Sequence, residues 1–139
     1  MLISYNELTA QANATKSGQF SSTFGYADRG DSVEFVFGQQ QTIRIGGVEV
    51  VLEKRFSEIN QVNIAGDFKG WSPDNGKYQM TKAGGTLFKI RISKSGLGAK
   101  GTSHQFKFVL NHQYWVEPPA EALNKFTGTD GNTNLTFRL

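Results

Sequence analysis

Short segments in which apolar and polar residues alternate recur from Asp31 onward, and they constrain the fold more than any other feature. Val33, Phe35 and Phe37 share one face of an extended segment, because successive side chains of a strand point to opposite sides. The same alternation recurs at Val62 and Ile64, at Phe88, Ile90 and Ile92, at Phe106, Phe108 and Leu110, and at Leu135, Phe137 and Leu139. Alternation with one polar face is typical of antiparallel sheets that are solvated on one side. About seven short strands without a central helix therefore predict an all-β fold, an immunoglobulin-like antiparallel β-sandwich.

A Gly46-Gly47 pair separates two further apolar segments, residues 42–45 and 48–54. Glycine tolerates the positive φ angles that two-residue turns between antiparallel strands require. We therefore predict a β-hairpin here.

The first 30 residues differ from the rest of the chain, because residues 9–30 are rich in small and polar side chains. Ser4 and Glu7 have the spacing of a capping box, in which the two side chains bond free N–H groups at a helix start. About two turns of helix would follow, which is marginal in isolation. We expect residues 1–30 to be an N-terminal extension, a short docked helix plus linker, and residues 31–139 to be the sandwich domain.

Composition excludes several classes of protein. The 139 residues suggest one domain, and 15 basic against 12 acidic residues give a net charge of +3, so we expect no nucleic-acid partner. No apolar run approaches the ~20 residues that span a bilayer, so we expect no membrane span. The absence of cysteine removes disulfides and thiolate metal sites. The N-terminus lacks a signal-peptide pattern, which favours the cytoplasm if Met1 is the native start.

Two motifs resemble cofactor or metal sites. Residues 96–101 match the dinucleotide fingerprint GxGxxG, but that motif needs a helix after it. Residues 104–110 alternate as a strand instead, so a hairpin loop is the better interpretation. His104 and His112 lie eight residues apart with no cluster of carboxylates beside them, which disfavours a metal site. We expect neither a metal nor a cofactor.

The sequence contains little that supports acid–base or nucleophilic catalysis. A glycosidase needs two carboxylates at a fixed spacing across a cleft, and the carboxylates here lie in or beside turn segments where acids commonly cap or solvate. There is no G-x-S-x-G nucleophile motif. We therefore expect a protein that is not an enzyme. The carboxylates considered are Asp67, Asp74, Glu117, Glu121 and Asp130.

Residues 62–71 are the first segment that points to a function. A strand runs into a bend at Gly66 and ends at Trp71, which lies beside Pro73. Turn residues around the indole place it at a strand end, where a large ring is only partly covered. An exposed flat ring suits sugar binding, because the C–H groups of a pyranose stack on it while the hydroxyls stay hydrated. The alternative for Trp71 is a position in the core.

A second cluster surrounds Lys107. Its side chain points away from the phenylalanines on either side of it, so it belongs to the solvent-facing side of the sheet. Residues 111–113 are predicted to form a hairpin turn, after which Tyr114 and Trp115 begin the next strand. Because these two rings are adjacent, one must face outward and the other the core. The alternation leaves open which one does so.

A third cluster contains Asn132 and Asn134 in the last predicted hairpin. Leu135 and Phe137 form the inward pair there, so Asn134 faces outward. An asparagine amide offers both donors and an acceptor, which suits neighbouring sugar hydroxyls. The alternative is that both asparagines only tie down a turn.

These three clusters together resemble the family 48 carbohydrate-binding modules. The segments are VNIAGDFKGW, QFKFVLNHQYWVEPP and GTDGNTNLTFRL, in this order. The family includes the glycogen-binding domain of the AMP-activated protein kinase β subunit and the N-terminal domains of branching and debranching enzymes. The resemblance covers about residues 60–139, with residues 33–37 as the family's first strand. It implies an immunoglobulin-like sandwich that binds α-1,4-linked glucans on one open face.

The resemblance also implies roles for individual residues. Trp71 matches the first stacking tryptophan of the family, and Lys107 matches the lysine that bonds glucose hydroxyls. Tyr114 takes the position of the second stacking tryptophan, with Trp115 as its neighbour. The smaller ring of Tyr114 implies weaker affinity or a different glucan preference.

In the last hairpin, Asn134 matches a sugar-contacting asparagine and Asn132 a contacting threonine. Asp130 replaces a leucine that passes through the ring of a cyclic sugar in the kinase subunit, which removes one apolar contact. Residues 39–59 form an insertion relative to the family, and residues 1–30 have no counterpart in it.

The expected function is thus a non-catalytic module that binds α-1,4-glucans, such as glycogen or starch, for a fused or associated enzyme. The alternative is a protein-docking β-sandwich that has lost sugar binding, because some members of the family act in that way. Docking would use Phe20, Phe24, Tyr26 and the 39–59 insertion.

Overall fold

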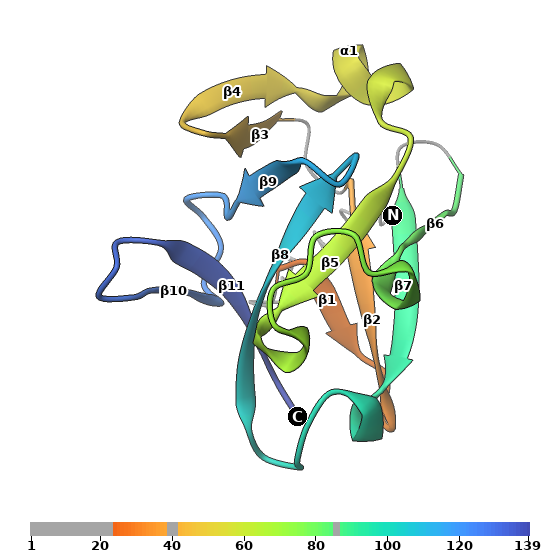
Figure 1. The fold of residues 1–139 in the computed structure, drawn as a ribbon, viewed down its shortest axis with the longest axis vertical. Helices are drawn as coiled ribbons and strands as arrows, with labels where there is room; N and C mark the ends of the chain where they lie inside the picture. The colour runs from red at the N-terminus through yellow and green to blue at the C-terminus, as the bar shows by residue number, and fades with distance from the viewer. Residues whose placement is uncertain (1–23, 39–41, 85–86) are drawn as a thin grey trace, which may run out of the picture.

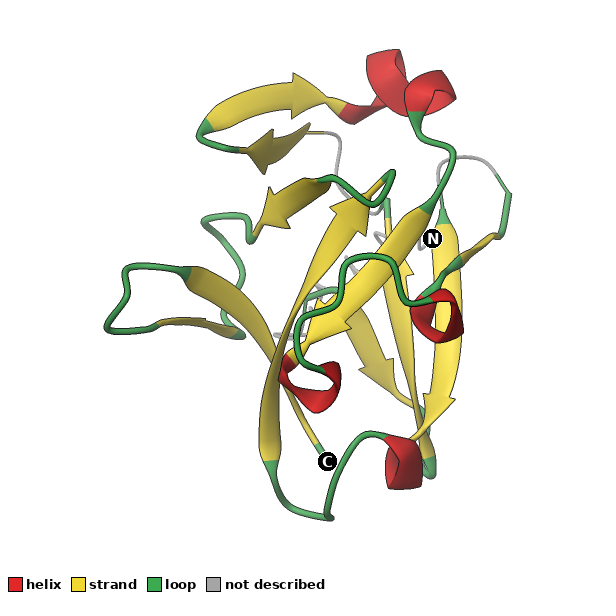
Figure 2. Cartoon of the chain, in the orientation of Figure 1, coloured by secondary structure: helices red, strands yellow, loops and turns green. Residues whose placement is uncertain are grey.

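The protein folds into two antiparallel β-sheets that lie face to face (Figure 1), and the helices in the described part of the chain are single turns (Figure 2). The computed structural model describes residues 24–38, 42–84 and 87–139. This architecture confirms the predicted all-β sandwich. The first sheet has the order β1-β2-β7-β6, with β1 Tyr26–Asp28, β2 Ser32–Phe37, β7 Phe88–Ser93 and β6 Thr81–Lys82.

The second sheet is the larger one and is organised around its longest strand, β8. The pairing runs β10-β11-β8-β9-β3-β4, with β11 and β9 one after the other along one edge of β8 and β5 along the opposite edge. The bounds are β10 Lys125–Thr127, β11 Thr133–Arg138, β8 Ser103–Leu110, β9 Tyr114–Glu117, β3 Thr42–Ile45, β4 Val48–Val51 and β5 Val62–Gly66. Because β8 touches β5, β9 and β11, side chains from distant parts of the sequence meet on its outward face.

Phenylalanine rings form the contact between the two sheets. Phe35 of β2 meets Phe106 of β8 and Phe137 of β11 with ring centroids 5.0 and 5.3 Å apart and planes at 70° and 87°. This edge-to-face arrangement is the one that aromatic quadrupoles favour. All three side chains are almost completely buried. The period-two alternation of these strands therefore identified the core correctly.

The predicted hairpin in the 39–59 segment exists and lengthens the second sheet. Gly46 and Gly47 adopt φ angles of 58° and 82° between β3 and β4, and β3 pairs with β9. The second strand is shorter than predicted, because β4 ends at Val51 and a helical turn, α1 (Leu52–Arg55), follows it. A second turn, η1 (Phe56–Glu58), leads on toward β5.

The sandwich begins earlier than the expected boundary at residue 31. β1 pairs with β2, and Phe24 is 8% exposed within the core. The side chain of Asn124 holds this segment: its Oδ1 accepts from the Phe24 N–H at 2.6 Å, and its Nδ2 donates to the Phe24 carbonyl at 2.9 Å. Phe24 is part of the core of this domain, and Tyr26 packs against that core. The predicted helix after Ser4, and Phe20, lie outside the described residues.

Within the three described ranges, no helix has the length and apolar character needed to cross a lipid bilayer.

Candidate carbohydrate-binding face

The outward face of β8 brings together four of the six residues that the sequence singled out, namely Trp71, Lys107, Trp115 and Asn134. Residues directly opposite each other on antiparallel strands share a face. Lys107 lies opposite Ala65 of β5, and Val109 lies opposite Trp115 of β9. On the third neighbour, Thr136 of β11 lies opposite Gln105. The register therefore places all these side chains on the side of the sheet away from the phenylalanine core.

Trp71 reaches this face from the loop that follows β5. The strand ends at Gly66, a turn η2 (Asp67–Lys69) follows, and the Trp71 N–H donates back to the Gly66 carbonyl at 2.9 Å. The indole is half-buried, and its ring centroid lies 6.5 Å from that of Trp115 with the planes tilted by 46°. Trp71 is thus neither a core residue nor a fully exposed one, and it pairs with the outward ring of β9.

The backbone of Trp71 is strained. Its φ of 59° falls in the left-handed region, directly after Gly70 at 64°. A bulky residue rarely adopts this conformation, and such outliers gather at functional sites. The loop thus holds a large aromatic side chain at a position where glycine would be the low-energy choice.

The loop before Trp71 is anchored to β8 through Asp67. Its Oδ2 accepts from the Gln105 N–H at 3.1 Å, and its Oδ1 lies 3.0 Å from Nδ1 of His104. A Cβ at Gly66 would collide with the ring of Phe68 and would lie 2.6 Å from the Gln105 carbonyl oxygen. Only glycine at position 66 therefore lets the turn pack this closely on β8.

Asp67, His104 and Thr102 follow one another in the order of an acid–imidazole–hydroxyl triad. Nε2 of His104 lies 2.8 Å from Oγ1 of Thr102. The Thr102 hydroxyl, however, donates to the Ala99 carbonyl at 2.6 Å, whereas a nucleophilic hydroxyl gives its proton to the imidazole. The ring of His104 also stacks on Phe137 at 5.6 Å. We interpret this set as a structural clamp between η2 and the start of β8.

Lys107 is half-buried on this face, near enough to the carboxylates of Glu117 and Asp130 to be affected by their charge. Burial lowers the pKa of its amine below the ordinary 10.5, and the negative charges of Glu117 and Asp130 oppose this shift. Glu117 lies two residues beyond Trp115 and so shares its face, and its Oε2 accepts from the Gly47 N–H at 3.0 Å. The two carboxylates outweigh the single ammonium charge, which suits an uncharged polar ligand better than an anionic one.

The two asparagines of the last hairpin have different environments. Asn134 is half-buried on the outward face, and its Nδ2 donates to Oε1 of Gln105 at 2.8 Å. Asn132 is exposed and gives both its backbone N–H and its Nδ2 to the carboxylate of Asp130, at 2.9 and 3.0 Å. These bonds lower the pKa of Asp130. Asn134 thus lies on the same face as Lys107, whereas Asn132 ties down the turn.

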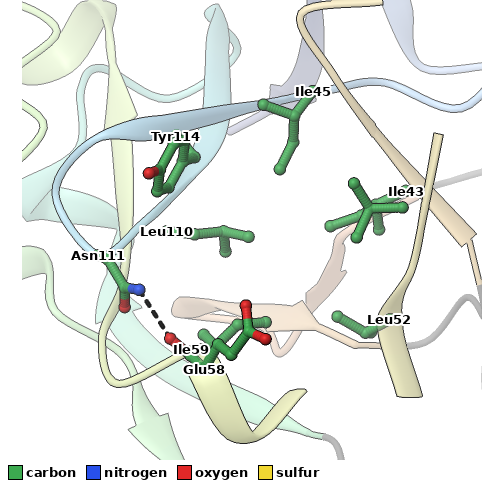
Figure 3. Close-up of a pocket in the computed structure, with 9 residues that line it drawn as sticks. Ile43, Ile45, Leu52, Glu58, Ile59, Leu110, Asn111 and Tyr114 are labelled. Atoms are coloured by element: carbon green, nitrogen blue, oxygen red, sulfur yellow. Dashed lines mark hydrogen bonds between the residues drawn. The ribbon is translucent and has the colours of Figure 1, made fainter. Parts of the chain in front are cut away.

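The structure does not bring Tyr114 together with the other predicted site residues. Tyr114 lies opposite Leu110, on the other side of the sheet from Trp115. There it lines an apolar pocket of about 260 Å³, with its ring directed toward that pocket (Figure 3). The other lining residues are Ile43, Ile45, Val50, Leu52, Glu58, Ile59, Leu110 and Asn111.

The hairpin turn explains why Trp115 rather than Tyr114 faces outward. The turn spans residues 111–113, and both Asn111 and His112 adopt left-handed φ angles of 52° and 61°. A three-residue turn pairs Val109 with Trp115. The family resemblance matches Tyr114 to the second stacking tryptophan without taking account of this pairing. In this fold Trp115, and not Tyr114, is the ring beside Trp71.

Gln105 and Glu117 belong to this face, although neither was named as a site residue. The alternation of β8 already places Gln105 on the side of Lys107, so that signal was present in the sequence. Glu117 could be found only once Trp115 was known to face outward, because the two residues lie two positions apart on one strand.

The motif at residues 96–101 and the two histidines have the ordinary roles expected for them. The motif joins a turn, η4 (Lys94–Gly96), to the strand β8, so no helix follows it and the dinucleotide mechanism does not apply. His112 lies in the hairpin turn, at the other end of β8 from His104. In the described part of the chain, no three His, Asp or Glu side chains gather as a metal site would require.

The surface described above consists of two tryptophans beside a half-buried lysine and an outward-facing asparagine. Its residues come from the same three segments that resemble the family 48 modules. No family model matches this chain, and no curated protein matches it either.

Proposed function

We propose that this protein is a non-catalytic module of the family 48 type that binds α-1,4-glucans on the outward face of β8. The observation that supports this most is the pair of indole rings, Trp71 and Trp115, 6.5 Å apart beside Lys107. Two tilted rings suit a glucan chain that curves, because successive sugar units of such a chain present their apolar faces at an angle to one another.

Stacking supplies most of the affinity in this proposal. Aromatic contacts contribute about 0.5–1.5 kcal/mol each beyond the area that they bury. Trp71 is held in a strained backbone conformation, which is what a preorganised platform requires. Because hydroxyl groups must lose water on binding, the resulting affinity is expected to be micromolar to millimolar.

Polar side chains next to the rings supply selectivity. The Lys107 ammonium group donates to sugar hydroxyls, and Asn134 offers a carbonyl acceptor while Gln105 fixes its amide. The carboxylates of Glu117 and Asp130 near Lys107 disfavour phosphate-rich or other anionic polymers. The ligand that fits this surface best is a neutral chain of hydroxyl-bearing rings.

Such a module acts by holding a glucan near a fused or associated enzyme and so raising the local substrate concentration. A protein-docking role has one observation in its favour: the edge strand β4 exposes Val48 and Val51, at 64% and 43%. Exposed apolar edge strands are sites of pairing with other chains. Because β4 lies two strands away from Trp115, docking there and glucan binding are compatible.

Titration with maltoheptaose tests the proposal directly. Tryptophan fluorescence of the full chain should change, with saturation in the micromolar to millimolar range, and Trp71→Ala should no longer be retained on amylose. Cellohexaose, which has β-1,4 links, serves as the matched control and should bind much more weakly. A wild-type protein whose fluorescence ignores maltoheptaose, β-cyclodextrin and glycogen would overturn the proposal.

A further inference from the structure

We propose that the glucan site extends across β11 to Phe126, which forms a second aromatic platform and makes binding depend on chain length. This inference rests on the proposed function and goes beyond it. It concerns a residue outside the three clusters that the sequence singled out.

Phe126 lies on the same face as the rest of the site. It is directly opposite Asn134 in the β10–β11 pair, and Asn134 faces outward with its amide bonded to Gln105. Residues opposite each other share a face, so the ring of Phe126 is on the side of Lys107. It is 53% exposed, whereas most phenylalanines in the described part of the chain are buried.

The local structure keeps this ring accessible. The next residue, Thr127, joins its hydroxyl to that of Thr133 across the two strands at 2.7 Å, and Lys125 donates to the carbonyls of Ala120 and Ala122. Both neighbours of Phe126 thus fix the strand without covering the ring. The hairpin is a rigid support for an exposed aromatic side chain.

The strand pairing sets the distance between the two platforms. β9 and β11 pair one after the other with the edge of β8 that faces away from β5, β9 at residues 109–110 and β11 at residues 103–106. Trp115 is therefore one strand from β8 and Phe126 two strands from it on the same side, so the two residues are separated by about one strand spacing across the sheet and about two residues along it, roughly 8 Å at the backbone. A pyranose ring is about as long as one strand spacing, so a glucan that stacks on both platforms needs about three glucose units.

The chemistry between the platforms supports the same ligand. The face carries an aromatic ring at Phe126, polar groups at Asn134 and Lys107, and two further aromatic rings at Trp115 and Trp71. A glucan chain has apolar ring faces and a hydroxyl rim, so it can satisfy both kinds of surface in turn. A short sugar can reach only one platform.

Comparison of Phe126→Ala with the wild-type full chain, by calorimetric titration with maltose and maltoheptaose, tests this inference. We expect Phe126→Ala to bind maltoheptaose about threefold to tenfold more weakly and maltose with unchanged affinity. Phe126→Trp, which enlarges the platform and avoids any loss of hairpin stability, should bind maltoheptaose more tightly. Leu123→Ala is the matched control, because Leu123 is also apolar and exposed, at 76%, and it should change neither affinity.

The two proposals fail in different ways. If the wild-type protein binds maltoheptaose but Phe126→Ala binds it equally well, or loses maltose and maltoheptaose to the same extent, the extended site is wrong and the glucan module stands. If the wild-type protein binds neither sugar, the proposed function itself is wrong and the extended site falls with it.

Discussion

The indole rings of Trp71 and Trp115 lie 6.5 Å apart, although 44 positions separate them in the sequence (115 minus 71). One ring comes from a loop after β5 and the other from β9, and both strands pair with β8. The central strand of the larger sheet therefore builds the aromatic part of the site by holding its two neighbours.

Adjacent aromatic residues provide the sharpest test of the site. Trp115→Ala should reduce maltoheptaose affinity at least tenfold, because it removes one of the two paired indole rings, whereas Tyr114→Ala should leave it within about twofold, because Tyr114 faces the apolar pocket. Calorimetric titration of both variants measures the difference. Equal losses in the two variants would mean that the outward face has been assigned incorrectly.

The backbone strain at Trp71 has a measurable consequence. A left-handed conformation costs a residue with a Cβ about 1–2 kcal/mol relative to glycine. The unfolding free energy of Trp71→Gly, measured by urea denaturation, should therefore be about 1 kcal/mol higher than that of Trp71→Ala. Both variants should lose retention on amylose. Equal stabilities would show that the φ of 59° is not strained in solution.

Glucan binding should weaken at alkaline pH. Burial lowers the pKa of Lys107 below 10.5. Its ammonium group therefore gives up a proton, and becomes a weaker hydrogen-bond donor, at a lower pH than that of an ordinary lysine. Because the folded pKa lies below the unfolded one, the unfolding free energy from this group rises over the same interval. Weaker glucan binding in this pH range would therefore not be explained by a Lys107-linked loss of stability.

Lys107→Arg separates this effect from other titrations. Arginine stays protonated throughout the interval, so the maltoheptaose affinity of Lys107→Arg, although altered in size, should not fall between neutral pH and 10.5. If the maltoheptaose affinity of the variant and of the wild type fell together with rising pH, the pH dependence would belong to another group.

The clamp at Asp67 should act on the site indirectly. Asp67→Ala removes the acceptors for the Gln105 N–H and for His104, which should lower the unfolding free energy by about 1–3 kcal/mol. It should also weaken glucan binding, because the loop no longer holds Trp71 beside Trp115. Tryptophan fluorescence of the free protein reports on that pair, and an unchanged spectrum with unchanged affinity would contradict a positioning role. Asp74→Ala is a suitable control, because Asp74 is exposed and bonds only Ser72 among the described residues.

Much of the fold could be predicted because it depends on local periodicity. Alternation identified the buried faces of β2, β7, β8 and β11, and the two glycines identified the hairpin between β3 and β4. The start of the domain could not be placed in this way, because β1 has only three residues and is held by pairing with β2 and by Asn124. The β2 partners are only 5 to 9 positions away, but a three-residue strand is too short to show a period, and Asn124 is 100 positions away from Phe24.

The sequence by itself determined which residues of each strand face outward together, since side-chain direction follows from a period of two within one strand. This was sufficient to place Lys107 and Asn134 on outward faces. Only the tertiary structure decided that Trp115 rather than Tyr114 joins Trp71, and that Phe126 lies on the same surface. Both outcomes depend on turn length and strand register, which arise from pairing between segments distant in the chain and not from the order of residues within one strand.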